Sequence, residues 1–364
     1  MKFTFVFLVA VISFSLADDC RVTRFDEIEN AVENCKAIVI ENLFVPGGKT
    51  LELLLKEGSK LTFKGRTTFG FTEWDGPLVM INGTNVFIEG EDGAILDGQG
   101  QLYWDGQGGW SGTVKPTFFT IQLHNSVMRN IYVLNTPMGC ALITDSTNVQ
   151  FSDWVIDDLS GDQDKAPGKY GHNTDGFDIF NSTGITVRNA SIYNQDDCVA
   201  VRSGSNIIID NFYCHGGHGL SVSVGFSDDS VELNTLSNVT ISNSVLEKGQ
   251  NAIHVKTHVD SGNGSISNVT YENITFKGLT STGINIQQNY RNLPPNSTQP
   301  KVPKNNIPIR NLQLINVTGS VLSSAVPIYI VCAEEGCYDW MFTDVSVTGK
   351  KSNDCNFTPS DFNC

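Results

Sequence analysis

The sequence predicts an all-β protein folded as a parallel β-helix, with a short helix capping its N-terminal end. Short runs rich in β-branched residues recur along the chain, each introduced by Asn, Ser or Gly, and their spacing is often 22 or 23 residues. Good helix signals are nearly confined to residues 26–35. Repeated coils of about 22 residues, each with the same few strands, are typical of a β-helix because one coil cannot bury its apolar face alone.

The chain opens with the features of a secretory signal peptide. Lys2 precedes an apolar run from Phe3 to Leu16, and Ser15-Leu16-Ala17 offers small residues at a cleavage site. This pattern is typical of a signal peptide, and the run is short for a bilayer span of about 20 residues. We therefore expect residues 1–17 to be removed, and residues 18–364 to form a single secreted, extracellular domain with no membrane partner.

Two interleaved series of runs make up the repeat. The first reads NSVMRNIYV, TNVQFSDWVI, TGITVRNASI, SNIIIDNFY, SNVTISNSVL, SNVTYENITF and RNLQLINVTG. The second reads GCALITDS, NTDGFDIFNS, QDDCVAVRSG, GHGLSVSVG, NAIHVKTH, TGINIQQNY and VPIYIVCAE. Longer spacings, as from Asn206 to Asn238, indicate loops inserted between strands. A β-sandwich or propeller is the alternative, and Asn-Gly hairpin turns, which would favour it, are scarce.

Net charge restricts the partners of this chain. The formal net charge is −15, which excludes most nucleic-acid binding because phosphate recognition needs a basic surface. An acidic protein that acts on an acidic polymer needs Lys, Arg or His at the site itself to offset the global field. We expect a monomer that binds no nucleic acid.

The cysteines and glycosylation sequons fit a secreted chain. Nine cysteines suggest four disulfides and one buried thiol, Cys140. Spacing proposes the pairs Cys20 with Cys35, Cys198 with Cys214, Cys332 with Cys337, and Cys355 with Cys364. No Cys or His cluster has zinc-ligand spacing, so we expect no metal site. Ten Asn-x-Ser/Thr sequons occur, at Asn82, Asn181, Asn189, Asn238, Asn263, Asn268, Asn273, Asn296, Asn316 and Asn356.

Acidic residues gather in the second series at intervals of one coil. Asp175 lies in NTDGFD, Asp196 and Asp197 lie in QDDC, and His218 lies in GHG. Asp175 and Asp197 are 22 residues apart, and Asp197 and His218 are 21 apart. These intervals predict neighbouring positions on successive coils, about 4.8 Å apart per rung.

Such a cluster suits glycosidic cleavage. Crowded carboxylates repel one another, so at least one of them is expected to have a raised pKa. Glycosidic cleavage uses a protonated carboxyl as general acid and an ionised carboxylate as base or nucleophile. The alternative is that Asp residues only cap turns of the β-helix. We favour that alternative for Asp178 alone, but not for the cluster with His218 and Lys256.

The chain resembles the polygalacturonases of glycoside hydrolase family 28 over nearly all of its length after residue 17. The resemblance is carried by NTDGFD, QDDC, GGHGLS, the His-Val-Lys segment, the CxxxxC segment and the terminal Cys pair. It implies a right-handed parallel β-helix, no cofactor, and hydrolysis of α-1,4-linked galacturonan with inversion. It also implies Asp196 as general acid, Asp175 and Asp197 as activators of water, and His218 as support for the protonation of the acid.

Cation positions depart from the family pattern. The resemblance assigns Lys256 and Tyr290 to holding the sugar and its carboxylate, but the family has Arg-x-Lys where this chain has His254-Val255-Lys256. A charged His254 could pair with the substrate carboxylate, so we expect substrate binding to weaken as pH rises through the His254 pKa. Arg202, where the family more often has a neutral residue, is a candidate for the missing cation.

The leading hypothesis is a polygalacturonase acting on pectic homogalacturonan, with endo attack favoured over exo. A rhamnogalacturonan hydrolase on the same scaffold is a second reading, and the His218 motif and Tyr290 disfavour it. A third is a pectin-binding pseudoenzyme, or a decoy for plant inhibitor proteins, which the His254 substitution allows and the three intact aspartates disfavour.

Overall fold

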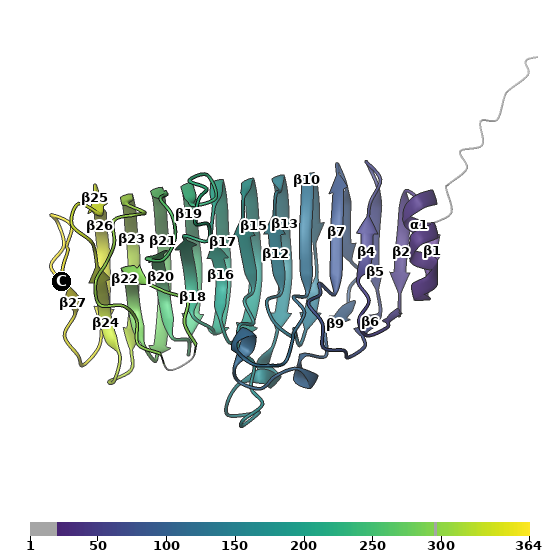
Figure 1. Ribbon diagram of the computed structural model, residues 1–364, viewed down its shortest axis with the longest axis horizontal. Helices are drawn as coiled ribbons and strands as arrows, with labels where there is room; N and C mark the ends of the chain where they lie inside the picture. Colours follow the sequence, from purple (N-terminus) through teal and green to yellow (C-terminus); the bar gives the residue numbers. More distant parts are fainter. Residues whose placement is uncertain (1–19, 295–296) are drawn as a thin grey trace, which may run out of the picture.

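The computed structural model describes residues 20–294 and 297–364. The expected signal peptide and the sequon at Asn296 lie outside these ranges. Strands lie side by side along one long axis, with β1 and α1 at one end and β27 at the other (Figure 1). In the described part of the chain the strands pair in parallel along the stack, and they join into one sheet that winds through the coils. The predicted all-β parallel β-helix is confirmed.

Three rows of strands form the faces of the helix. The row that carries the second sequence series is β4 (Leu51–Leu54), β7 (Val79–Thr84), β10 (Phe119–Arg129), β12 (Ala141–Thr144), β14 (Phe177–Phe180), β16 (Asp197–Val201), β18 (Gly219–Val224), β20 (Asn251–His258), β22 (Thr282–Tyr290), β24 (Val326–Val331) and β27 (Asp354–Cys355).

The row that carries the first series is β1 (Cys20–Val22), β2 (Ala37–Glu41), β5 (Lys60–Lys64), β8 (Phe87–Gly90), the end of β10, β13 (Thr147–Asp157), β15 (Ser182–Asn194), β17 (Gly204–Gly216), β19 (Thr235–Glu247), β21 (Ser265–Leu279), β23 (Ile309–Val321), β25 (Cys337–Tyr338) and β26 (Met341–Thr348). The shortest row, β3 (Phe44–Val45), β6 (Arg66–Phe69), β9 (Ile95–Asp97) and β11 (Tyr132–Leu134), continues into the second half of β13.

Alternation of side chains builds the core. Along the second-series row, every other residue points inward, and residues in register on successive coils stack on one another. One such column contains only fully buried aliphatic residues: Ile143, Ile179, Val201, Val222, Val255, Ile286 and Ile330. Burial of each Val or Ile side chain contributes roughly 1.5–3 kcal/mol, so stacking is the main stabilising term.

Asparagines open the strands because their backbone turns there. Asn206, Asn238, Asn268 and Asn311 all have positive φ, between 51° and 57°, a left-handed conformation that Asn tolerates better than most residues. Their side chains form a ladder, in which each Nδ2 donates to Oδ1 of the residue one coil earlier, at 2.8 to 3.3 Å. The ladder accounts for the Asn near the start of these four runs.

The ends of the stack are closed by a helix and by disulfides. Helix α1 (Ile28–Asn34) follows the 3-10 turn η1 (Phe25–Glu27) and buries Ile28 and Ala31 against the first coils. The four Cys pairs proposed from spacing are all bonded, and Cys140 is free and buried. None of the helices in residues 20–294 and 297–364 combines the length and apolarity that crossing a membrane requires.

Candidate active site

A cavity of about 990 Å³ opens on the second-series row. Its floor comes from β14, β16, β18 and β20, and its sides come from long loops. The loop between β9 and β10 contains η2 (Gly100–Leu102) and η3 (Gly108–Trp110), and the loop between β13 and β14 contains η4 (Leu159–Gly161). Both loops project from the same side of the stack (Figure 1).

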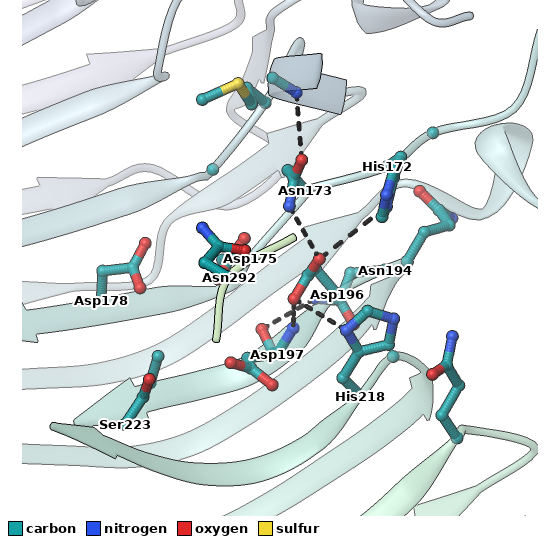
Figure 2. Close-up of a pocket in the computed structure, with 18 of the residues that line it drawn as sticks. His172, Asn173, Asp175, Asp178, Asn194, Asp196, Asp197, His218, Ser223 and Asn292 are labelled. Atoms are coloured by element: carbon teal, nitrogen blue, oxygen red, sulfur yellow. Dashed lines mark hydrogen bonds and ion pairs between the residues drawn. The ribbon is translucent and has the colours of Figure 1, made fainter. Parts of the chain in front are cut away.

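The register places the acidic residues as the one-coil spacing predicts. Phe177 pairs with Val199, and Asp197 pairs with Gly219. Asp175, Asp196 and His218 therefore precede equivalent strands on three successive coils, and all line the cavity. In Figure 2 Asp196 and His218 point toward one another, and Asp175 lies to one side of this pair.

Asp196 and His218 form a closely coupled pair. Nδ1 of His218 lies 3.0 Å from Oδ1 of Asp196, and both side chains are largely buried. Burial alone would raise the pKa of Asp196, but the charge and hydrogen bond of His218 outweigh it, and the pKa is lowered. Burial likewise opposes the charge on His218, but Asp196 raises its pKa. In this arrangement the shared proton rests on His218.

Asp197 is held in its charged form by two donors. Nζ of Lys256 lies 2.9 Å from Oδ2, and Oγ of Ser221 donates to Oδ1 at 2.6 Å. Although burial works against a charged ammonium, Asp197 raises the pKa of Lys256 above its ordinary value. Lys256 also lies 5.0 Å from the ring centroid of Tyr290, so both residues expected to hold the sugar line the cavity.

Asp175 has the opposite electrostatic environment. Burial and the neighbouring carboxylates Asp196, Asp178 and Asp197 raise its pKa, and the guanidinium of Arg202 opposes this only from 4.0 Å. The prediction that at least one carboxyl of the cluster has a raised pKa is thus confirmed for Asp175. Asp196, the residue expected to be protonated, is shifted the other way.

Arg202 is engaged mainly by Asp178. Its Nη2 lies 2.5 Å from Oδ1 of Asp178, and its guanidinium lies 4.8 Å from the ring centroid of Phe226. Asp178 is buried and lines the cavity, so our interpretation of it as a simple turn cap is wrong. Alternation could have found it, because Phe177 and Ile179 point inward and Asp178 must then point to the cavity side.

Comparison with known proteins decides the family. Residues 35–364 match the glycosyl hydrolases family 28. The chain belongs to this family. It is 41% identical over 350 residues to a polygalacturonase from Phaedon cochleariae, covering 95% of this chain and 93% of that protein. It is 44% identical over 335 residues to a probable endopolygalacturonase E from Aspergillus niger, covering 91% and 84%.

A solved structure agrees with these relatives. Endopolygalacturonase I from Stereum purpureum, complexed with two galacturonate, superposes with a TM-score of 0.80 at 29% identity and covers 93% of this chain and 96% of that one. The endo-xylogalacturonan hydrolase from Aspergillus tubingensis, at 22% identity and a TM-score of 0.73, shares the fold.

His254 does not reach the cavity of this family 28 chain. It is 7% exposed, is absent from the cavity lining, and its Nε2 lies 3.2 Å from Nε2 of Gln287. Burial, followed by the charge of Lys256, holds its pKa well below the ordinary value. A neutral, covered imidazole is a poor partner for a carboxylate, so the structure does not support our expectation of a pH-dependent contact between His254 and the substrate.

Other polar residues at the site were missed by sequence reasoning. Nδ2 of Asn173 donates to Oδ2 of Asp196 at 3.1 Å, and Nδ1 of His172 lies 3.9 Å from the same oxygen. His258 is buried against Tyr290 and Phe226, and burial lowers its pKa to about 3. The only sequence signal for Asn173 and His172 was their position directly before Thr174 and Asp175.

Among the described residues, one group has the composition of a metal site. Ligand atoms of Asp196, Asp197 and His218 lie within 4.8 Å of one another. The atoms that would bind a metal ion are already engaged, however, since His218 pairs with Asp196 and the Lys256 ammonium pairs with Asp197. A cation entering there would displace an existing positive charge.

Proposed function

We propose that this chain is a secreted, monomeric polygalacturonase that hydrolyses α-1,4-galacturonosyl bonds of pectic homogalacturonan with inversion, by endo attack in preference to exo. The observation that carries the proposal is the cluster of Asp175, Asp196, Asp197 and His218 on successive coils of one cavity. The relatives named endopolygalacturonases, and the neighbour solved with galacturonate, support the substrate and the endo mode.

The general acid in this proposal is Asp196, with His218 as the store of its proton. In the free site the proton rests on His218, 3.0 Å away. A bound galacturonate brings a negative charge into the cavity, which raises the pKa of Asp196 and favours transfer of the proton to it. Asp196 then protonates the leaving glycosidic oxygen, and His218 is neutral until the next proton arrives.

Asp175 and Asp197 are the proposed activators of water. Asp197 is kept ionised by Lys256 and Ser221, and the raised pKa of Asp175 suits it to receive a proton from the attacking water. For inversion the acid and the base must be about 6.5–9.5 Å apart, with the water between base and sugar.

Local cations offset the acidity of the whole chain. The cavity is lined by Arg202, Lys248 and Lys256, although the formal net charge is −15. Lys256, beside Tyr290, is placed to bind the sugar carboxylate at the cleavage point. Arg202, which also lines the cavity, is the candidate cation for a second carboxylate of the polymer.

The deciding experiment is release of reducing ends from polygalacturonic acid by purified protein, beside an Asp196→Asn control. Activity that the control lacks supports the proposal. NMR of the first-formed anomer then tests the stereochemistry, with β expected from an α-linked substrate. An α product at early times contradicts inversion.

A second candidate is a pectin-binding protein without hydrolysis, including a decoy for plant inhibitor proteins. The observation that favours it is His254, which is buried and stands where the family pattern has the Arg of Arg-x-Lys. Binding to polygalacturonic acid without release of reducing ends, in wild type as in Asp196→Asn, supports this candidate over the enzyme.

A further inference from the structure

The loop between β9 and β10 carries Trp110 at the edge of the cavity and is held in shape by a buried lysine. The side chain of Lys115 is 1% exposed. Its Nζ donates to Oδ2 of Asp105 at 2.9 Å, to the carbonyl of Gly108 at 2.8 Å and to Oγ of Ser111 at 2.6 Å. Trp110, between these anchors, remains 42% exposed and lines the cavity.

This loop is joined to Asn173. The N–H of Gly109 donates to Oδ1 of Asn173 at 3.1 Å. The approach is close, because a Cβ on Gly108 would lie 2.1 Å from that oxygen. Since Oδ1 must accept from Gly109, the orientation of the amide is fixed, and Nδ2 faces the other way.

The other end of the same amide holds Asp196. Nδ2 of Asn173 donates to Oδ2 of Asp196 at 3.1 Å, while Oδ1 of Asp196 accepts from His218 and from the N–H of Asp197. Asn173 is thus the hydrogen-bond donor to Oδ2 in the described part of the chain. Figure 2 shows Asn173 between the short helix of the loop and Asp196.

We infer that Asn173 is a positioning residue that holds Asp196 in place and couples it to the loop carrying Trp110. The inference deepens the proposed function and rests on Asp196 being the acid. A hydrogen bond to Oδ2 stabilises the ionised carboxylate. When a sugar ring contacts Trp110 and Gly109 shifts, the amide moves with it, the bond to Oδ2 weakens, and Asp196 takes up its proton more readily.

Two substitutions distinguish the hydrogen bond made by Oδ1 of Asn173 from the one made by Nδ2. Asn173 has φ of 56°, so Asn173→Gly keeps the backbone and deletes both hydrogen bonds. Asn173→Asp keeps the acceptor for Gly109 but sets an oxygen against Asp196. We expect kcat to fall about 10- to 100-fold in both variants, because misplaced groups cost this much, with KM within about threefold. The alkaline limb of the pH profile, which reports loss of the proton from the general acid, moves to higher pH in both.

A double-mutant cycle tests the coupling. Trp110→Ala is expected to lower kcat in wild type but to have little further effect in Asn173→Gly. Phe226→Ala is the matched control, an exposed aromatic that lines the same cavity beside Arg202. Its effect should add to that of Asn173→Gly. Additivity for Trp110→Ala would overturn the coupling, and a kcat within twofold with an unchanged pH profile in Asn173→Gly would overturn the positioning role.

A measurement without substrate distinguishes failure of this inference from failure of the proposed function. The contribution of Trp110 to the fluorescence is obtained by subtracting the emission of the Trp110→Phe variant from that of the protein with Trp110. Acrylamide quenching of this signal should rise in Asn173→Gly and stay at the wild-type level in Asn173→Asp, which retains the bond to Gly109. Equal quenching in all three proteins would overturn the link between Asn173 and the loop, whether or not the protein hydrolyses polygalacturonic acid.

Discussion

The two sides of the acidic cluster differ in how close a cation comes to a buried carboxyl. On one side, His218 lies 3.0 Å from Asp196 and lowers its pKa. On the other, Arg202 lies 4.0 Å from Asp175, beyond hydrogen-bond reach, and the pKa of Asp175 is raised. Arg202 is committed to Asp178 instead. Two buried carboxyls on successive coils of one cavity thus have pKa values shifted in opposite directions, according to how close a cation lies.

A third buried carboxyl extends the comparison. Asp158, directly after β13, has no cation beside it among the residues that the structure describes, and it accepts hydrogen bonds from the N–H and Oγ1 of Thr136. Burial raises its pKa to about 8. Asp175 and Asp158 thus both have a raised pKa, whereas Asp196, with the imidazole of His218 in contact, has a lowered one.

The largest expected effect is at Asp196. Asp196→Asn keeps the shape of the side chain and cannot deliver a proton, so kcat should fall by a factor on the order of 10² to 10⁴ with little change in substrate binding. Steady-state kinetics on polygalacturonic acid measure it. Activity within a few-fold of wild type removes Asp196 from the mechanism.

Removal of the cation on the other side should have a smaller, pH-dependent effect. Arg202→Gln deletes the charge that opposes the raised pKa of Asp175, so that pKa should rise further. A rise of one unit lowers the ionised fraction about tenfold on the acid side. We expect kcat near pH 4 to fall about tenfold and to recover at higher pH. Arg202→Lys, which keeps the charge, is the control, and an unshifted acid limb in Arg202→Gln contradicts the comparison.

Asp158 should affect stability rather than catalysis. Its folded-state pKa of about 8 lies above the ordinary value of 3.8, so the folded chain holds a proton that the unfolded chain releases between these values. Stability therefore falls as pH rises through this window. Asp158→Asn should flatten the dependence of Tm on pH between about 4 and 8, by a few degrees at the upper end. Thermal unfolding followed by circular dichroism measures it, and parallel curves for the two proteins contradict the assignment.

The smallest expected effect is at His254. Since the imidazole is covered and burial holds its pKa well below the ordinary value, the neutral form is favoured, and we expect its charge not to govern KM between pH 4 and 7. His254→Gln, which can keep the contact with Gln287, should leave KM within about twofold across this range. If KM depends on pH in the wild type and not in the variant, the prediction is contradicted and His254 contacts the substrate carboxylate.

Sequence predicts what the repeat determines. The one-coil spacing of Asp175, Asp197 and His218 predicts their register, because stacking admits few alternatives. The same reasoning fails where loops determine which side chains reach the site. Asn173 reaches Asp196 from the loop between β13 and β14 and bonds to Gly109 of the loop that Lys115 holds, and nothing in the repeat fixes the path of either loop. His254 has the outward alternation of Lys256, but what covers it comes from neighbouring coils.

The stacked architecture also sets where the chain opens first. Each coil touches only its neighbours, so a solenoid frays from its ends, and protection from hydrogen exchange rises toward the middle. The coils of β14, β16 and β18 lie well inside the stack. Disulfides Cys20–Cys35 and Cys355–Cys364 fasten the two ends. Fluctuations that loosen the terminal coils therefore leave the catalytic cluster intact, and the active site is lost only when the central coils unfold together.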